Sequence, residues 1–301
     1  MSDSARNSAT ISPTAHYTAQ VWLRNGLSDE RLSTPQGNAL WHLLAPAMAV
    51  SRWVGGPTLE DFLLARHELI DLRLTDAIEA GRVSQVIEIA AGLSPRGLRI
   101  TRKYGDRVTY IEADLQGMAT HKRQLLGATP LNHRVTTVNA LADHGPDSLA
   151  ELVKTLDPSR GVAIVTEGLL NYFGRDDVLG MWDRFAHALA GFPHGLYLAD
   201  IHTNSANHGP MTDAFLLLLS IFVRSRVHIH VGTSQDVAAA LHDCGFITAT
   251  VLNPADFGDR LDACGRTWAK LVQVIEATSS SGGRAGGARL AAQTEPALPS
   301  R

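Results

Sequence analysis

The stretch Val86-Ile-Glu-Ile-Ala-Ala-Gly-Leu-Ser-Pro-Arg96 decides the fold of this chain. A short apolar run, which predicts a buried strand, passes directly into a turn of small residues around Gly92 and then into a helical segment. Such a turn lets a ligand approach the backbone and the N-terminus of the next helix, which is the general binding position of open α/β sheets. Taken alone, the turn fits an ordinary strand-to-helix connection equally well, because alanine fills positions 90 and 91.

Further short apolar runs follow and alternate with helix-sized segments. Five runs with such connections predict right-handed crossovers, and therefore a mostly parallel sheet with helices on both faces. The last two runs have no obvious helix between them, so we expect an antiparallel pair at one edge. The seven predicted strands cover residues 85–90, 108–112, 134–138, 162–166, 196–200, 246–252 and 269–275.

The residues before this sheet have a different character. Residues 14–82 place apolar side chains at three- and four-residue spacing, which predicts helices, with a break at Gly55-Gly-Pro57. We expect this segment to form a helical cap or lid on an α/β domain of residues 83–277. Residues 1–13 and 278–301 are mostly small and polar, and we expect them to be disordered.

The composition narrows the classes of partner. The 301 residues are 45% hydrophobic and carry a formal net charge of −3, which suits a globular core and gives no electrostatic reason to expect nucleic acid or a membrane surface. The start lacks an apolar leader, and the most apolar run, 214–223, is about half the roughly 20 residues of a membrane helix. We therefore expect a cytoplasmic protein. Cys244 and Cys264 lack ligand spacing, and the pair His228 and His230 lacks a third ligand, so we predict no metal site.

Acidic residues end two of the predicted strands. Asp114 lies 22 residues after Gly92, and an acid about 20 residues after the glycine turn is where a ribose hydroxyl pair is normally bound. Glu112, two residues earlier on the same strand, competes for this role. Glu167 leaves the fourth strand beside Gly168 and is expected at the same edge of the sheet.

These motifs together resemble the leucine carboxyl methyltransferase-like family, which includes bacterial O-methyltransferases associated with polyketide biosynthesis. The resemblance runs in register over about residues 60–200. It implies a class I methyltransferase-type sheet of seven strands and S-adenosyl-L-methionine as cofactor. The motifs that carry it are Arg66-His-Glu-Leu-Ile-Asp71, Val86 to Arg99, Tyr110-Ile-Glu-Ala-Asp-Leu115 with Lys122 and Arg123, and Thr166-Glu-Gly-Leu-Leu-Asn-Tyr172.

The resemblance also implies a set of cofactor-binding residues. Arg66 matches the arginine that reaches the methionine carboxylate, a role that suits the guanidinium fork. Asp114 matches the ribose acid, and Glu167 matches the acid near the cofactor's amino group. The full set is Arg66, Glu88, Gly92, Asp114, Asn139, Ala140 and Glu167.

The sequence departs from the family in the glycine turn and after the third strand. Ala90 replaces a glycine, Ser94-Pro95 replaces the usual Asp-Thr, and Asn139-Ala140 stands where the family has Asp-Leu at the adenine. These departures keep open a cofactor-binding protein that has lost catalysis. A nicotinamide-dependent oxidoreductase is a further alternative, although three spaced glycines and a Tyr-x-x-x-Lys pair are absent from the sequence.

The expected reaction is O-methylation of a carboxylate or a hydroxyl of a small molecule. A carboxylate is already ionised and needs no base, whereas a hydroxyl benefits from one. The candidate bases are Tyr17 and Tyr172, and His16 and His202 are further candidates. The sequence does not choose among these four groups. It gives no indication of the oligomeric state.

Overall fold

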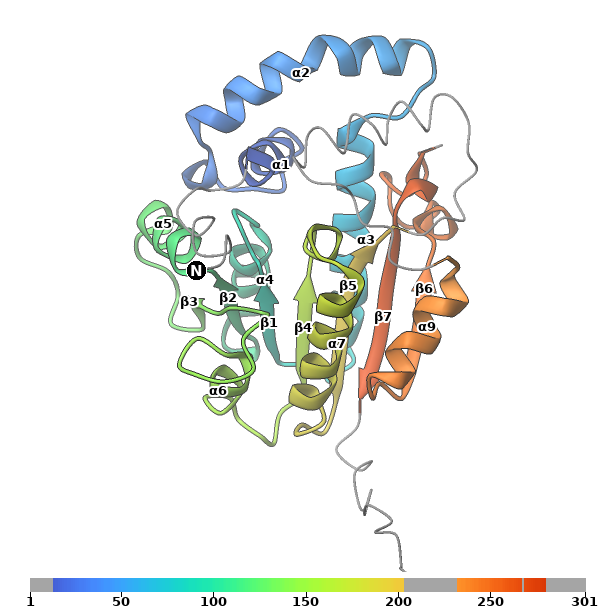
Figure 1. The fold of residues 1–301 in the computed structure, drawn as a ribbon. Coiled ribbons are helices and arrows are strands. Elements are labelled where there is room, and N and C mark those ends of the chain that lie inside the picture. The colour runs from blue at the N-terminus through green and yellow to red at the C-terminus, as the bar shows by residue number, and fades with distance from the viewer. Residues whose placement is uncertain (1–12, 203–231, 267, 280–301) are drawn as a thin grey trace, which may run out of the picture.

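A computed structural model describes residues 13–202, 232–266 and 268–279 and contains a seven-stranded sheet (Figure 1). The strand order is β3-β2-β1-β4-β5-β7-β6; neighbouring strands among β1 to β5 pair in parallel, and β7 is antiparallel to both β5 and β6. This confirms the predicted α/β class and its C-terminal reversal. The strands are β1 Gln85–Ile89, β2 Thr109–Asp114, β3 His133–Thr137, β4 Val162–Thr166, β5 Gly195–Ile201, β6 Thr248–Leu252 and β7 Gln273–Ser279.

Helices cover both faces of the sheet, because alternate residues of the buried strands point to opposite sides. Val86 packs in one apolar cluster with α3 (Leu59–Glu79) and α4 (Arg96–Tyr104). Ile87 packs in a second cluster with α6 (Leu149–Val153), α7 (Arg175–Leu189) and α9 (Ser234–Asp243). The remaining helix of the sheet, α5 (Gln116–Leu126), packs against β2 and β3.

The first two helices lie beyond the carboxyl ends of the strands (Figure 1). They are α1 (Pro13–Arg24) and α2 (Pro35–Trp53). The expected cap of residues 14–82 therefore divides in two, because α3 packs along a face of the sheet. Its residues Leu69, Ile70 and Leu74 are fully buried in the cluster that contains β1.

The last strand differs from the prediction. Residues Ala269–Leu271 form a short 3₁₀-helix, and β7 begins only at Gln273. It continues through Ser279, so the expected disordered tail from residue 278 begins too early. The reason is the length of its partner: β5 offers seven residues, and its first residue, Gly195, pairs with Ser279.

Short 3₁₀-helices connect several of these elements. Besides Ala269–Leu271, they are η3 Glu30–Leu32, η4 Gly105–Arg107, η5 Leu170–Tyr172 and η6 Pro254–Phe257.

None of the helices in the described ranges is long and apolar enough to cross a membrane. Residues 1–12 and 280–301, and the pair His228 and His230, lie outside the described residues.

Candidate active site at the carboxyl edge of the sheet

The turn after β1 has a left-handed backbone at two positions. Ala90 has φ +54°, and Gly92 has φ +48°. The amide of Gly92 donates a hydrogen bond of 2.7 Å to Oδ2 of Asp114 at the end of β2, and the amide of Leu115 donates one of 2.7 Å to Oδ1. Asp114 therefore holds the turn, and burial raises the pKa of this carboxyl.

The two acids of β2 have different surroundings. Glu112 is fully buried behind the sheet edge, with Nζ of Lys122 at 2.8 Å and Nε2 of His133 at 3.3 Å from its carboxylate. Burial alone would raise the pKa of Glu112, but these two groups lower it below its ordinary value. Asp114 is thus the acid of β2 that reaches the carboxyl edge, as the spacing from Gly92 predicts.

Arg66 of α3 reaches the ends of β4 and β5. Its Nε donates to Oε1 of Glu167 at 3.1 Å, and its Nη1 donates to Oδ2 of Asp200 at 2.8 Å. The amide of Gly168 donates to the other oxygen of Asp200 at 2.6 Å. Gly168 has φ +71°, and a Cβ there would lie 3.1 Å from Nη2 of Arg66, so glycine leaves room for the guanidinium.

A second arginine, Arg96, shares the carboxylate of Glu167 with Arg66. Arg96, in the first turn of α4, is fully buried and donates from Nε to Asp71, from Nη1 to Glu88 and from Nη2 to Oε2 of Glu167. The other oxygen of Glu88 accepts a bond of 2.8 Å from the hydroxyl of Tyr110. Glu88 therefore lies within the buried network on the α4 side of the sheet and is 1% exposed.

His67 connects these groups through both ring nitrogens. Nδ1 lies 2.8 Å from Oε2 of Glu167 and 2.9 Å from Nη2 of Arg96. Nε2 lies 3.2 Å from Nη2 of Arg99. Burial lowers the pKa of His67 to about 4, so the ring is neutral at pH 7. Burial would raise the pKa of Glu167, but His67, Arg96 and Arg66 hold it far below its usual range.

Asn139 and Ala140 follow β3, next to the end of β2. Oδ1 of Asn139 accepts a bond of 3.0 Å from the amide of Leu141, and the amide of Asn139 donates to Asp147 at 2.8 Å. The amide of Val138 donates to the carbonyl of Asp114 at 2.9 Å, which fixes this loop to the end of β2. The side chain of Asn139 thus caps its own loop.

The four candidate catalytic groups are distributed unevenly. Tyr17 is buried in the apolar core, and burial raises its pKa to about 12, so it is no base at neutral pH. His16 is bonded to the hydroxyl of Thr34 at 2.9 Å, and burial lowers its pKa. Tyr172 lies in η5, beyond β4, with its hydroxyl 2.8 Å from that of Thr14.

His202 directly follows β5 and stacks on Phe62, with ring centroids 5.1 Å apart. Its Nδ1 lies 3.4 Å from the carbonyl of Leu271, which can only accept, so Nε2 is the unprotonated nitrogen. Burial lowers the pKa of His202, which keeps it neutral. Of the four groups, His202 and Tyr172 are those that follow strand ends at the carboxyl edge.

Three residues of the site were missed by sequence reasoning: His67, Arg96 and Asp200. A signal for them existed, because Glu88 and Asp200 interrupt otherwise apolar strands, and a buried carboxylate requires a cationic or hydrogen-bonding partner. The motif 86–99 supplied such partners, but spacing alone does not say which arginine pairs with which acid.

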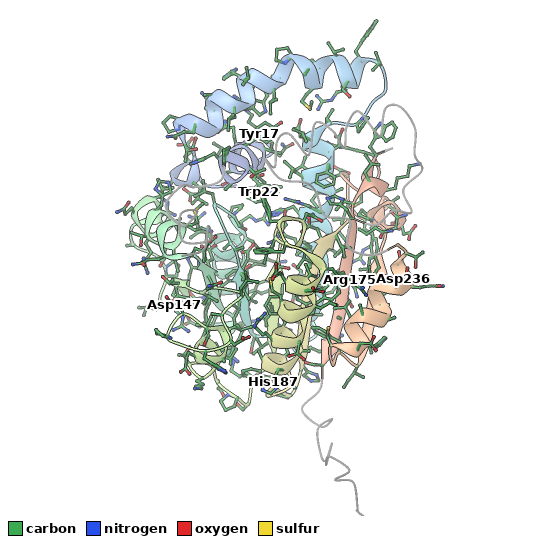
Figure 2. All side chains as sticks on the ribbon, viewed as in Figure 1. Tyr17, Trp22, Asp147, Arg175, His187 and Asp236 are labelled. Atoms are coloured by element: carbon green, nitrogen blue, oxygen red, sulfur yellow. The ribbon has the colours of Figure 1, made fainter. Side chains whose placement is uncertain are left out.

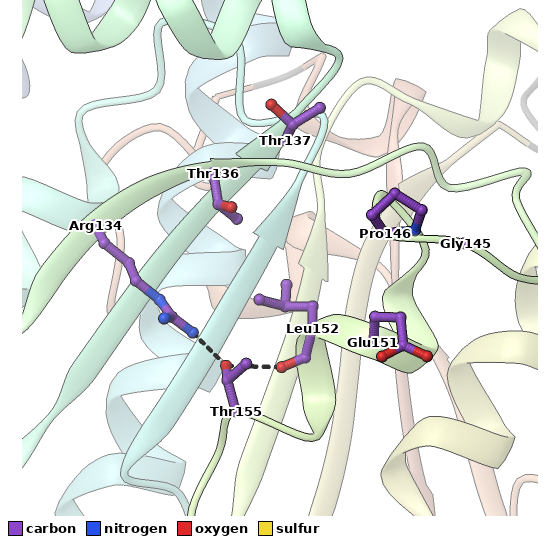
Figure 3. Close-up of a pocket in the computed structure, with 8 residues that line it drawn as sticks. All are labelled: Arg134, Thr136, Thr137, Gly145, Pro146, Glu151, Leu152 and Thr155. Atoms are coloured by element: carbon purple, nitrogen blue, oxygen red, sulfur yellow. Dashed lines mark hydrogen bonds between the residues drawn. The ribbon is translucent and has the colours of Figure 1, made fainter.

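A cavity of about 520 Å³ lies elsewhere, beside edge strand β3 (Figure 3). Thr136 and Thr137 line it from the strand, and Glu151 and Leu152 line it from α6. It is separate from the edge that carries Gly92 and Glu167. Trp22 of α1, which is labelled in Figure 2, packs against His67, with ring centroids 4.7 Å apart.

Comparison with known proteins agrees with the fold described above. The chain resembles a candidate methyltransferase from Thermobifida fusca YX (TM-score 0.59, 15% identity, covering 92% of this chain and 98% of that one) and a DUF574 family protein from Streptomyces avermitilis MA-4680 (0.59, 15%, 88% and 97%). It also resembles the CMeT domain of the citrinin polyketide synthase (0.53, 12%, 90% and 66%). These likenesses show the fold. The chain spans 53% and 55% of two longer matched structures, PigF and the S-adenosylmethionine-dependent methyltransferase SibL.

No curated protein matches the sequence. A sequence model named leucine carboxyl methyltransferase matches residues 23–186, more than half of the chain, and this range includes every residue of the expected cofactor set. The chain therefore belongs to the leucine carboxyl methyltransferase family, a family of S-adenosylmethionine-dependent methyltransferases.

Proposed function

We propose that this protein transfers a methyl group from S-adenosylmethionine to a carboxylate or hydroxyl oxygen of a small molecule, in the cytoplasm. One observation carries the proposal: Gly92, Asp114 and Glu167 lie at the carboxyl ends of the adjacent strands β1, β2 and β4, and Arg66 of α3 reaches Glu167 there. Open α/β sheets bind their ligands at this edge.

The residues present fit the cofactor. Asp114 can accept hydrogen bonds from a ribose hydroxyl pair, and the glycine turn lets the ligand approach the backbone. Arg66 keeps Nη2 against Gly168 while its other two nitrogens are bonded, so one end of the fork can donate to a carboxylate. When bound, S-adenosylmethionine supplies an electrophilic methyl group on a sulfonium, and the protein contributes alignment and exclusion of water.

The charge of the buried network favours a cationic ligand. Around Arg66 and Arg96 there are four carboxylates and three guanidinium groups, and His67 is neutral. The network thus has one excess negative charge. S-adenosylmethionine carries a net positive charge from its ammonium and sulfonium groups, so the network attracts it. The seven charged residues are Asp71, Glu88, Glu167, Asp200, Arg66, Arg96 and Arg99.

The same geometry weighs against a nicotinamide dinucleotide. In dinucleotide-binding folds the turn after the first strand gives its amides to the pyrophosphate. Here the amide of Gly92 already donates to the carboxylate of Asp114, so this turn does not offer it to a pyrophosphate. An oxidoreductase of that type is therefore disfavoured on physical grounds as well as by the family.

Ligand binding tests the cofactor. S-adenosylhomocysteine at a hundred times its dissociation constant should raise the free energy of unfolding by about 2.7 kcal/mol, whereas NADH and NADPH should not raise it. A calorimetric titration at millimolar S-adenosylhomocysteine that shows no heat of binding would end the methyltransferase proposal. Methyl transfer to any acceptor of a panel would exclude a protein that has lost catalysis.

The two classes of acceptor differ in their need for a base. Methylation of a hydroxyl should depend on His202 or Tyr172, whereas methylation of a carboxylate should survive the replacement of either. Rates for matched acid and phenol acceptors, measured with His202→Gln and Tyr172→Phe, decide between them. Loss of turnover with an acid acceptor in both variants, at saturating S-adenosylmethionine, would count against a carboxylate acceptor.

A further inference from the structure

We propose that Arg96 is a positioning residue of the cofactor site, which acts through Glu167 to orient Arg66 toward the amino-acid end of the cofactor. The inference rests on the proposed function, because it assumes that Arg66 binds the methionine carboxylate. It concerns a residue that touches no part of that ligand itself.

The first step is the geometry of the Arg96 guanidinium. Its three nitrogens bond to carboxylates on three separate elements: Nε to Asp71 of α3 at 2.5 Å, Nη1 to Glu88 of β1, and Nη2 to Oε2 of Glu167 after β4 at 2.5 Å. Arg96 has no exposed surface. A planar fork held at all three nitrogens has one orientation, so it holds all three carboxylates in place.

The second step is the division of the Glu167 carboxylate. Oε2 is bonded to Nη2 of Arg96 and lies 2.8 Å from Nδ1 of His67. Oε1 accepts a hydrogen bond from Nε of Arg66. Because Arg96 fixes Oε2, the direction of Oε1 is fixed as well. Arg66 is then held at Nε by Glu167 and at Nη1 by Asp200, which leaves Nη2 directed along Gly168.

The third step distinguishes a positioning role of Arg96 from a purely structural one. Arg96 bonds to Glu167, at the end of the site expected to bind the amino acid, whereas the expected ribose acid Asp114 is held by the amides of Gly92 and Leu115. A change at Arg96 should therefore weaken ligands that carry the methionine carboxylate and leave ligands that lack it unaffected. A purely structural role would weaken both kinds.

Two probes make this distinction: S-adenosylhomocysteine, and 5′-methylthioadenosine, which has the adenosine and the thioether but no amino acid. Arg96→Lys keeps one charge and loses the fork. It should lower the affinity for S-adenosylhomocysteine about tenfold, within the range measured for contacting network residues, and change the affinity for 5′-methylthioadenosine less than twofold. Arg73→Met is the matched control, because Arg73 makes a bidentate pair with Glu276 away from the site. It should bind both probes as the unchanged protein does.

Coupling to Glu167 completes the test. If Arg96 acts through Glu167, Arg96→Lys should cause no further loss of S-adenosylhomocysteine affinity in a Glu167→Gln background. Equal losses in both backgrounds, equal losses for the two probes, or no loss at all would each overturn the inference while leaving the methyltransferase proposal intact. If the unchanged protein binds neither probe, both proposals fall.

A second variant covers the case in which Arg96→Lys does not fold. Asp71→Asn removes the negative charge that Arg96 and Arg99 share at this residue, and no contact between Asp71 and Glu167 is involved. Asp71 is only partly buried. It should weaken S-adenosylhomocysteine in the same selective manner, though by less. Unchanged binding of both probes by Asp71→Asn would then overturn the inference.

Discussion

The hydroxyl of Tyr172 in η5 lies 2.8 Å from the hydroxyl of Thr14 in the first turn of α1. The next residue, Ala15, lies against the glycine turn, because a Cβ at Gly92 would be 3.6 Å from Cβ of Ala15. The start of α1 is thus fixed to the far side of the carboxyl edge while it covers the glycine turn. This contact is the part of the expected cap with the most direct bearing on the cofactor.

Removing either hydroxyl should loosen α1 by the same amount. Tyr172→Phe and Thr14→Val should each weaken S-adenosylhomocysteine about fivefold, because a hydrogen bond contributes about 1 kcal/mol. The double variant should lose no more than either single variant, and Thr14→Ser, which keeps a hydroxyl, should bind normally. Calorimetric titration measures all four. A loss of turnover confined to Tyr172→Phe, with binding unchanged, would instead make Tyr172 a catalytic group.

Replacing the two acids of β2 should affect different properties of the protein, namely cofactor binding for Asp114 and stability for Glu112. Asp114→Ala should weaken cofactor binding strongly, since it removes the expected ribose partner and releases the turn at Gly92. Glu112→Gln should bind the cofactor normally but unfold more easily, because it leaves Lys122 buried without its counter-charge, which typically costs about 3–5 kcal/mol. Urea unfolding and calorimetry on both variants separate the effects. If Glu112→Gln loses the cofactor with its stability intact, the assignment of the ribose acid is wrong.

The left-handed turn gives a prediction about backbone strain. Ala90 has φ +54°, a conformation that costs an ordinary residue about 1–2 kcal/mol and glycine almost nothing. Ala90→Gly should therefore leave the free energy of unfolding unchanged or raise it by up to about 1 kcal/mol, after the entropy cost of glycine. Its neighbour Ala91 is the control, since it is not among the described residues with positive φ, and Ala91→Gly should lower stability. Equal destabilisation by both variants would contradict the strain.

Stability should fall on acidification before the carboxylates titrate. Burial lowers the pKa of His67 from 6.5 to about 4, so between these values the unfolded chain binds a proton that the folded protein does not. The free energy of unfolding should then drop by about 3 kcal/mol as the pH falls from 6.5 to 4. His67→Gln should flatten this slope without abolishing it, because the pKa values of His16 and His202 are shifted in the same direction. An unchanged slope in urea unfolding at pH 4 to 7 would contradict the assignment.

The sequence predicted the parallel part of the sheet closely. The strand over residues 162–166 agrees with β4, and β1 ends one residue earlier than expected, because fully buried strands appear as continuous apolar runs. The last strand was placed too early, since the apolar run that contains it begins in the 3₁₀-helix Ala269–Leu271. Only pairing with β5 fixes where β7 starts and stops.

The site divides in the same manner. Gly92, Asp114 and Glu167 were found because strand ends and the spacing between them place such residues at one edge. Arg96 was not found, because an arginine in the first turn of a helix is usually exposed to solvent. Its burial depends on Glu88 within the same motif and on Asp71 and Glu167, which lie 25 and 71 residues away. The spacing of a single motif carries no information about the two distant acids. The individual cofactor-binding roles stay predictions until ligands are measured.

The position of β7 has a consequence for how the protein is made. This strand lies between β5 and β6 and joins them, and its Glu276 pairs with Arg73 of α3, about 200 residues earlier in the chain. A ribosome adds roughly 5–20 residues per second, so β5 emerges several seconds before the strand that covers its edge. During that interval the exposed edge of β5 can pair with another nascent chain. Chaperones that bind unpaired strands should therefore associate with this protein late in its synthesis, until Ser279 has emerged and the sheet closes.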